Sequence, residues 1–211
     1  MSNHDSAGQI STDFDLEADQ IKCMAFRAFK AGEQFKIYYG DRNNHDMLVH
    51  NGFVAAENAA NALQVKLGIS KNDALASAKY DLLSRLVISP QGHFQVGRDP
   101  EKPLDQPTLA FLRVMCLSTQ EEIDLWGSED KIRGLLDEQL EGEDKELDLK
   151  AYKYISTRCT LLLRSYPTSI EDDEKALKNV DLPLTLQYCA RLRKAEKQIL
   201  EKVIEFCKRK V

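Results

Sequence analysis

Apolar and polar positions follow two different rhythms along this chain. An apolar-rich run over residues 21–29 and an alternating run over 35–39 predict two strands joined by a turn at Ala31-Gly32. A short strand is also predicted over 63–67, and a short extended segment over 93–96. From residue 70 onward apolar residues recur every three or four positions, which is typical of amphipathic helices. The pattern therefore predicts an α+β chain in which helix dominates.

Hydrogen-bonding side chains mark the expected helix starts. Ser, Thr or Asp placed just before a periodic apolar run can accept hydrogen bonds from the free N–H groups of the first turn. The longest helices are predicted over 147–166 and from Leu182-Pro183 to the end of the chain. In the last helix Lys and Arg alternate with the apolar face, which indicates a packed helix with solvated basic positions. The predicted starts are Ser70 with Asp73, Thr119 with Glu122, Ser128, Ser169 with Asp172, and Leu182-Pro183.

Composition and charge restrict the classes of function. The chain has 29 Lys and Arg against 34 Asp and Glu, a net charge of -5, which argues against broad nucleic-acid binding. No apolar run approaches the roughly 20 residues that cross a bilayer, and the first residues lack a signal-peptide pattern. We therefore expect a soluble protein with neither membrane nor nucleic acid as partner, located in the cytoplasm, with the nucleus as a second location.

Cysteine and histidine spacing predicts no metal site. The five cysteines are scattered, odd in number and without a CxxC pair, so neither a disulfide framework nor a zinc site is indicated. The four histidines form no cluster, and His45 and His50 lie five positions apart on a predicted short helix, so their side chains point in different directions. We expect reduced thiols and no bound metal.

The segment from residue 34 to 53 carries the candidate chemistry. A strand ends at Gly40, a polar turn follows over 41–44, and a short helix ends at Gly52. Tyr39 therefore stands at the end of a strand beside a turn, a place where scaffolds often hold reacting side chains. From the residues alone two interpretations stay open: a buried aromatic residue that only packs, or a functional tyrosine.

Two motifs in this order resemble a known family. One is YGxxxN leading into a helix that is followed by GF, and it resembles the end of a SET methyltransferase domain of the Rubisco-methyltransferase type. The other is the pair Asn3-His4, which resembles the NH motif with which these proteins hold S-adenosylmethionine. The stretches AGEQFKIYYGDRNN and VKLGISKNDAL are similar to the actin-histidine methyltransferase branch. The first motif is carried here by Tyr39-Gly40, Asn44, Leu48 and Gly52-Phe53.

The resemblance covers the whole chain and implies two domains. Residues 1–54 would be the C-terminal portion of a β-rich SET domain, and 55–211 a mostly helical substrate-binding domain of the Rubisco-methyltransferase type. The implied reaction is methyl transfer from S-adenosylmethionine to a histidine of actin, or to another protein substrate. By the same resemblance Tyr39 would be catalytic, Asn3 and His4 would bind the cofactor, and Ile37 and Arg42 would line the substrate groove.

The position of the NH pair sets a further expectation. In the family this pair comes late in the SET domain, whereas here it stands at residues 3–4. We therefore expect a chain that lacks the first half of the catalytic domain and is inactive by itself. The spacing from His4 to Tyr39 is one residue longer than in the family, near Ala7-Gly8, which puts the fit of the NH turn in question. Two alternatives stay open: a non-catalytic protein-binding module built on the helical domain, and a protein-lysine methyltransferase of the same class.

Overall fold

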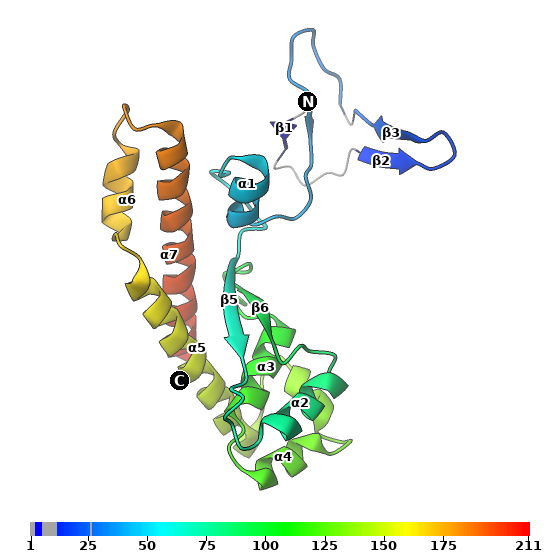
Figure 1. The fold of residues 1–211 in the computed structure, drawn as a ribbon, viewed down its shortest axis with the longest axis vertical. Helices are drawn as coiled ribbons and strands as arrows, with labels where there is room; N and C mark the ends of the chain where they lie inside the picture. Colours follow the sequence, from blue (N-terminus) through cyan, green and yellow to red (C-terminus); the bar gives the residue numbers. More distant parts are fainter. Residues whose placement is uncertain (1–2, 6–11, 26) are drawn as a thin grey trace. The chain divides into compact units, whose positions relative to one another are not determined.

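The computed structural model describes residues 3–5, 12–25 and 27–211 of the chain (Figure 1). Contacts divide the chain into two compact units, Met1–Asn61 and Ala62–Val211. Short strands and one helix make up the first unit, while helices dominate the second. The chain is thus α+β, as the sequence pattern predicts. The assignment of 1–54 and 55–211 to two particular domains stays a prediction.

Two pairs of short strands form the sheets of the first unit. β1 (Asn3–His4) pairs in parallel with β4 (Lys36–Ile37), and β2 (Thr12–Asp15) pairs antiparallel with β3 (Gln20–Cys23). The predicted pairing of 21–29 with 35–39 is therefore wrong, and both predicted strands are longer than the observed ones. Ala7 and Gly8, where the extra residue was expected, lie outside the described residues.

A local turn explains why β3 pairs with β2. The Asp15 carboxylate accepts hydrogen bonds from the backbone N–H groups of Glu17 and Ala18, at 3.1 and 3.0 Å. Asp19 follows with a φ of 49°, a left-handed conformation that Asp tolerates better than most residues. The tight turn brings β3 directly back against β2, because closing a short loop costs less entropy than closing a long one.

Helix α1 (Asn44–Asn51) follows the predicted turn and is confirmed as a short helix that ends at Gly52. The Asn43 side chain accepts a hydrogen bond from the Asp46 N–H at 2.8 Å and so caps the start. Gly52 has a φ of 78°, and its N–H donates to the Leu48 carbonyl. Glycine fits this left-handed position without steric cost, so the chain can leave the helix there.

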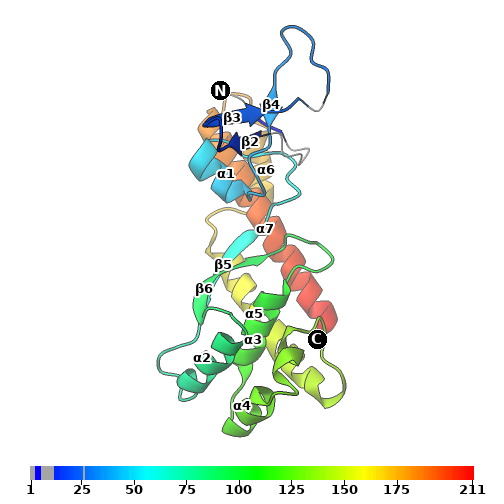
Figure 2. The same cartoon turned by 90° about the vertical axis from the view of Figure 1, so that its right-hand side faces the viewer.

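The second unit begins with a pair of antiparallel strands, β5 (Leu63–Gly68) and β6 (Gln91–Val96). Helix α2 (Ala76–Arg85) lies between the two strands in the sequence. Both predicted extended segments are confirmed. The two long helices α5 (Lys145–Ser165) and α7 (Leu184–Lys210) lie side by side, with α6 (Ile170–Leu177) against α7 (Figures 1 and 2). The remaining elements are α3 (Gln106–Cys116), α4 (Gln120–Gly127), η1 (Ile132–Leu136) and η2 (Gly142–Asp144).

Helix α3 is at the centre of the core of this unit. Its Phe111 is fully buried and lies against Phe94 of β6, with ring centroids 4.5 Å apart. At the end of β6, Gly97 has a φ of 80°, and a Cβ there would lie 2.3 Å from a methyl carbon of Ile199 on α7. The absence of a side chain at Gly97 therefore lets α7 approach the β5–β6 strand pair closely.

Two of the predicted capping boxes are confirmed. At α4, Thr119 accepts from the Glu122 N–H and the Glu122 carboxylate accepts from the Thr119 N–H. At α6, Ser169 and Asp172 make the same reciprocal pair. Each box satisfies two N–H groups that have no partner within the helix.

Two other predicted helix starts are wrong. The Ser70 hydroxyl accepts from Asn72 N–H and the Asp73 carboxylate from Leu75 N–H, so both residues build turns ahead of α2. Ser128 instead ends α4 by donating its hydroxyl to the Leu125 carbonyl. The helical segment that follows, η1, is a 3-10 helix.

A buried ion pair joins α3 to α5. The Arg113 side chain is fully buried and donates from Nε to the Asp148 carboxylate at 2.7 Å. The same guanidinium donates to the backbone carbonyls of Leu135 and Asp137, and the second Asp148 oxygen accepts from Leu140 N–H. This single pair therefore fixes the irregular segment between α4 and α5 to the core.

A second buried ion network joins α6 to α7. The Asp173 carboxylate has no exposed surface and lies 2.6 Å from the Arg193 guanidinium and 2.7 Å from the Lys197 ammonium. Lys197 also donates to the Thr168 carbonyl at 2.8 Å. Burial by itself would raise the pKa of Asp173, but the hydrogen bonds from Arg193, Lys197 and Thr168 hold it below its ordinary value.

All five cysteines are free thiols, and Cys159 and Cys207 are buried. Burial raises the pKa of each of these two thiols to about 12, so they are unreactive packing residues. Within the described ranges no helix is both long and apolar enough to cross a bilayer. The same ranges contain no group of three His, Cys, Asp or Glu side chains that could hold a metal ion.

Candidate active site

The parallel pairing of β1 with β4 brings the two motifs of the sequence together. His4 is the register partner of Ile37, so its ring lies next to the residues that follow β4. The backbone N–H of Tyr39 donates to His4 Nδ1 at 3.3 Å, and the two ring centroids lie 5.3 Å apart. The structure therefore joins His4 and Tyr39, which lie 35 positions apart in the sequence.

Two more aromatic rings, those of Tyr38 and Phe53, lie near the His4 ring. The ring centroid of Tyr38 lies 5.8 Å from that of His4, and the centroid of Phe53 lies 6.1 Å away. Neither residue was predicted as a site residue. Phe53 belongs to the GF end of the motif, so the motif itself signalled its presence, whereas nothing in the sequence singled out Tyr38. The site is an aromatic cluster around one imidazole.

The imidazole of His4 favours its neutral form. Partial burial lowers the pKa of His4 below its ordinary value of 6.5; nearby Asp5 opposes this and Lys36 adds to it. Since Nδ1 accepts a hydrogen bond from Tyr39, the ring proton of the neutral form is on Nε2. The hydrogen bond thus fixes both the orientation of the ring and its tautomer.

Asn3 and His4 have polar groups available for a ligand. Asn3 is exposed in β1 and pairs in register with Lys36. Neither the Asn3 amide nor the Nε2 of His4 hydrogen-bonds a residue in the part of the chain that the structure describes. An amide and an imidazole N–H can each donate a hydrogen bond to a polar ligand.

The turn after β4 is held by its own side chains. The Asp5 N–H donates to the Ile37 carbonyl at 2.9 Å, which extends the β1–β4 pairing by one residue. The Tyr38 hydroxyl donates to the Asp41 carboxylate across Gly40, which has a φ of 89°. Ile37 is half-buried beside this turn. These contacts fix the backbone on both sides of Tyr39.

Arg42 lies in the turn just before α1. Its guanidinium donates to the Asn51 side chain at 3.2 Å, and its carbonyl accepts from Asn58 at 2.8 Å. Arg42, Asp46 and His50 line a surface hollow of about 390 Å³. The structure thus brings Asn3, His4 and Ile37 together on one strand pair, and it places Tyr39 and Arg42 in the turn between β4 and α1.

A group of hydrogen-bonded asparagines anchors the end of this unit. Asn44, nearly fully buried, donates from its backbone to Asn61 at 3.0 Å and from its side chain to the Ala55 carbonyl at 3.2 Å. Asn58 donates to the Asn44 side chain at 3.0 Å. The motif pointed to Asn44, but no motif pointed to Asn58 or Asn61. Their only signal was an Asn-rich composition.

Two of the sequence relatives are actin-histidine N-methyltransferases. The chain is 36% identical over 208 residues to the actin-histidine N-methyltransferase of Xenopus tropicalis, and 37% identical over 209 residues to that of Homo sapiens. Each match covers 97% of this chain but only 35% and 34% of the relative. The chain therefore spans about a third of the length of these curated relatives.

The fold is similar to that of solved structures of Rubisco LSMT. The structure bound to AdoMet has a TM-score of 0.81 at 22% identity, covering 99% of this chain and 48% of that chain. The structure bound to sinefungin and monomethyllysine has a TM-score of 0.79 at 23% identity, with the same coverage. The family model described as Rubisco LSMT substrate-binding matches residues 70–200, more than half of the chain. The chain belongs to the Rubisco LSMT substrate-binding family.

Proposed function

We propose that the protein carrying this chain transfers a methyl group from S-adenosylmethionine to a histidine side chain of actin in the cytoplasm. In this proposal the first unit supplies the Tyr39 turn, and the helical second unit binds the protein substrate. The observation that carries it is the hydrogen bond from Tyr39 N–H to His4 Nδ1. It unites the cofactor motif and the tyrosine motif, as a methyltransferase site requires.

The roles of the residues follow from their chemistry. Asn3 and His4 would hold the cofactor through the amide and the Nε2 proton, and Tyr39, beside His4, would direct its hydroxyl at the reacting groups. Bound S-adenosylmethionine would supply an electrophilic methyl group. The acceptor imidazole, with an ordinary pKa of about 6.5, is largely neutral near pH 7 and needs alignment more than a strong base. Ile37 and Arg42 would shape the groove for the substrate.

The relatives favour histidine over lysine as the target. The named relatives at 36–37% identity are actin-histidine enzymes, whereas the structures seen with lysine or monomethyllysine are 19–23% identical and support the fold alone. A lysine ammonium, with an ordinary pKa of about 10.4, must first lose a proton before it can accept a methyl group. We therefore keep lysine methylation and non-catalytic binding as the alternatives.

The proposal is tested with a chimaera of known parent activity. In the Xenopus tropicalis relative, this chain replaces the 208-residue segment that it matches. Monomeric actin and S-adenosylmethionine are incubated with the chimaera or with the parent, and the modified residue is mapped by mass spectrometry. We expect methylation of a histidine, at the same position that the parent modifies.

Other outcomes separate the alternatives. Methyl groups found on lysine would favour a protein-lysine methyltransferase. A chimaera that melts cooperatively and binds actin, but modifies nothing while the parent is active, would leave only the non-catalytic binding module. Cofactor affinity is measured in the same samples, so that loss of the cofactor site is distinguished from loss of alignment.

A further inference from the structure

The middle and end of α5 concentrate positive charge in an acidic chain. After Asp148, residues 149–165 of this helix contain Lys150, Lys153, Arg158 and Arg164 and no carboxylate. The whole chain has a net charge of -5. Such a local excess of cations attracts acidic partners, although the chain as a whole repels them.

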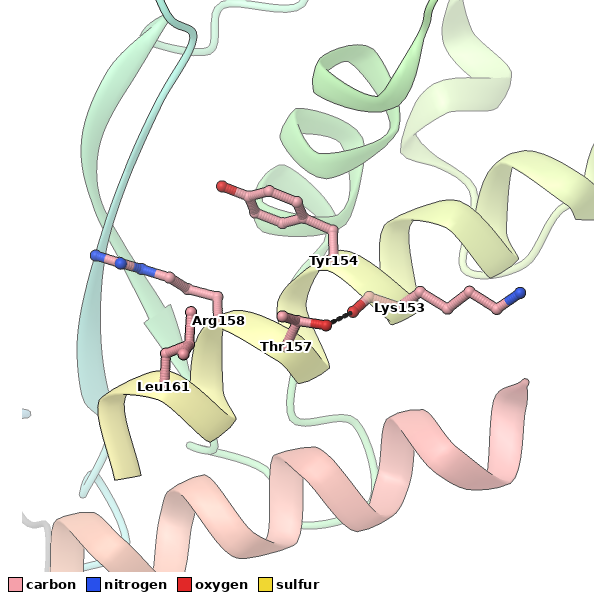
Figure 3. A pocket seen from close by; sticks show the side chains of 5 residues that line it. All are labelled: Lys153, Tyr154, Thr157, Arg158 and Leu161. Atoms are coloured by element: carbon pink, nitrogen blue, oxygen red, sulfur yellow. Dashed lines mark hydrogen bonds between the residues drawn. The ribbon is translucent and has the colours of Figure 1, made fainter. Parts of the chain in front are cut away.

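A hollow of about 430 Å³ lies on this helix (Figure 3). All of its lining residues come from α5: Lys153, Tyr154, Thr157, Arg158 and Leu161. Tyr154 is 40% exposed and Leu161 is 55% exposed, so the hollow offers apolar surface as well as charge. Figure 3 shows the Arg158 guanidinium and the Lys153 ammonium extending in opposite directions, with Tyr154 and Thr157 between them.

Lys153 and Arg158, the two cations of this hollow, form no ion pair with the residues that the structure describes. No carboxylate of the described residues lies within 4 Å of Lys153 or Arg158. Lys150, one turn earlier, is instead 3.0 Å from Glu122 of α4. The Thr157 hydroxyl donates to the Lys153 carbonyl within the helix at 2.9 Å. Lys153 and Arg158 therefore keep their hydrogen-bond donors for a ligand.

We propose that Lys153, Tyr154, Arg158 and Leu161, the basic α5 face, dock an acidic segment of the protein substrate in which carboxylates flank an apolar side chain. Arg158 can bind a carboxylate through two parallel hydrogen bonds, and Lys153 supplies a second charge. Tyr154 and Leu161 pack against the apolar side chain, and Tyr at such surfaces contributes large contact area at low entropy cost. This assignment rests on the proposed function, since it takes the second unit as the part that binds substrate.

The test measures binding of two labelled probes to the 211-residue chain by fluorescence anisotropy. One probe is monomeric actin, and the other is a short peptide of glutamate and leucine, with a lysine-and-leucine peptide as its negative control. The double variant Lys153→Glu/Arg158→Glu should raise the Kd for both acidic probes at least about tenfold, because opposite charges become like charges. Lys202→Glu, an exposed cation on α7, is the matched control and should stay within about twofold.

The outcomes separate this inference from the proposed function. Equal actin binding by wild type and the double variant would overturn the α5 assignment and leave the methyltransferase proposal intact. Binding of the acidic peptide, lost in the double variant, without binding of actin would uphold the basic face but remove actin as its partner. Failure of wild type to bind either probe would overturn the inference. Circular dichroism confirms that each variant is folded.

Discussion

Tyr39 donates its backbone N–H to the Nδ1 of His4 at 3.3 Å, so the tyrosine and the imidazole belong to one hydrogen-bonded unit. A backbone donor cannot rotate away as a side chain can, and the turn around Gly40 is itself fixed by the contact of Tyr38 with Asp41. The backbone at Tyr39 is therefore coupled to the orientation of the His4 ring. This coupling is the physical basis for treating the two motifs as one site.

The protonation of His4 should depend on folding. Its pKa in the folded chain lies below the ordinary 6.5, chiefly because of burial, so protonation favours the unfolded unit. The stabilisation from the neutral ring should be fully present above pH 6.5 and be lost as the pH falls through the lower, folded pKa. An NMR titration of the His4 ring measures this directly, with the same chain in concentrated urea as reference. A folded pKa at or above the urea value would contradict the burial that we describe.

Arg113→Ala should strongly destabilise the helical unit. The change leaves Asp148 buried without its counter-charge and frees two backbone carbonyls, and breaking such a pair costs about 3–5 kcal/mol. The free energy of unfolding is measured by urea denaturation. Arg133→Ala removes an exposed arginine of η1 and is the matched control. We expect it to change the free energy of unfolding by less than about 0.5 kcal/mol. Equal effects of the two variants would show that the buried pair adds nothing.

Asp173→Asn should release α6 from α7. Lys197, which is buried, would lose its counter-ion, and we expect the amides of α6 to exchange with solvent about a hundredfold faster, equivalent to about 2.7 kcal/mol. Glu171→Gln, on the exposed side of the same helix, is the control. In the wild type, the depressed pKa of Asp173 means that this stabilisation is present above the ordinary 3.8 and is lost as the pH falls through the folded pKa. If the α6 amides of the variant exchanged with solvent as slowly as those of the wild type, the ion network would not be what holds α6 against α7.

Features set by local hydrogen bonds could be predicted from the sequence. The Thr119–Glu122 box and the Gly52 helix end each need only a few neighbouring residues. The same logic failed at Asp73, because its carboxylate lies 2.6 Å from Lys79 and also accepts from Leu75. A capping residue has several possible partners, and the sequence alone does not say which of them the fold selects.

Features set by distant contacts could not be predicted from pattern alone. The pairing of β1 with β4 joins residues more than thirty positions apart. The resemblance assigned His4 to the cofactor and Tyr39 to catalysis, but it did not predict the hydrogen bond between them. No motif pointed to Asn58 and Asn61, because an asparagine has the same sequence signature whether its amide faces water or a buried Asn44. Burial decides its role, and burial is a property of the fold.

The measurement that tests the central claim most directly is methyl transfer to actin by the chimaera with Tyr39→Phe, read by mass spectrometry alongside cofactor titration. Losing one oriented hydroxyl should lower the rate by about a hundredfold, while the Kd for S-adenosylmethionine stays within about twofold, since Asn3 and His4 are untouched. Tyr80→Phe, on α2, is the matched control and should keep the full rate. A full rate with Tyr39→Phe would contradict the role of Tyr39 and, with it, the joined site.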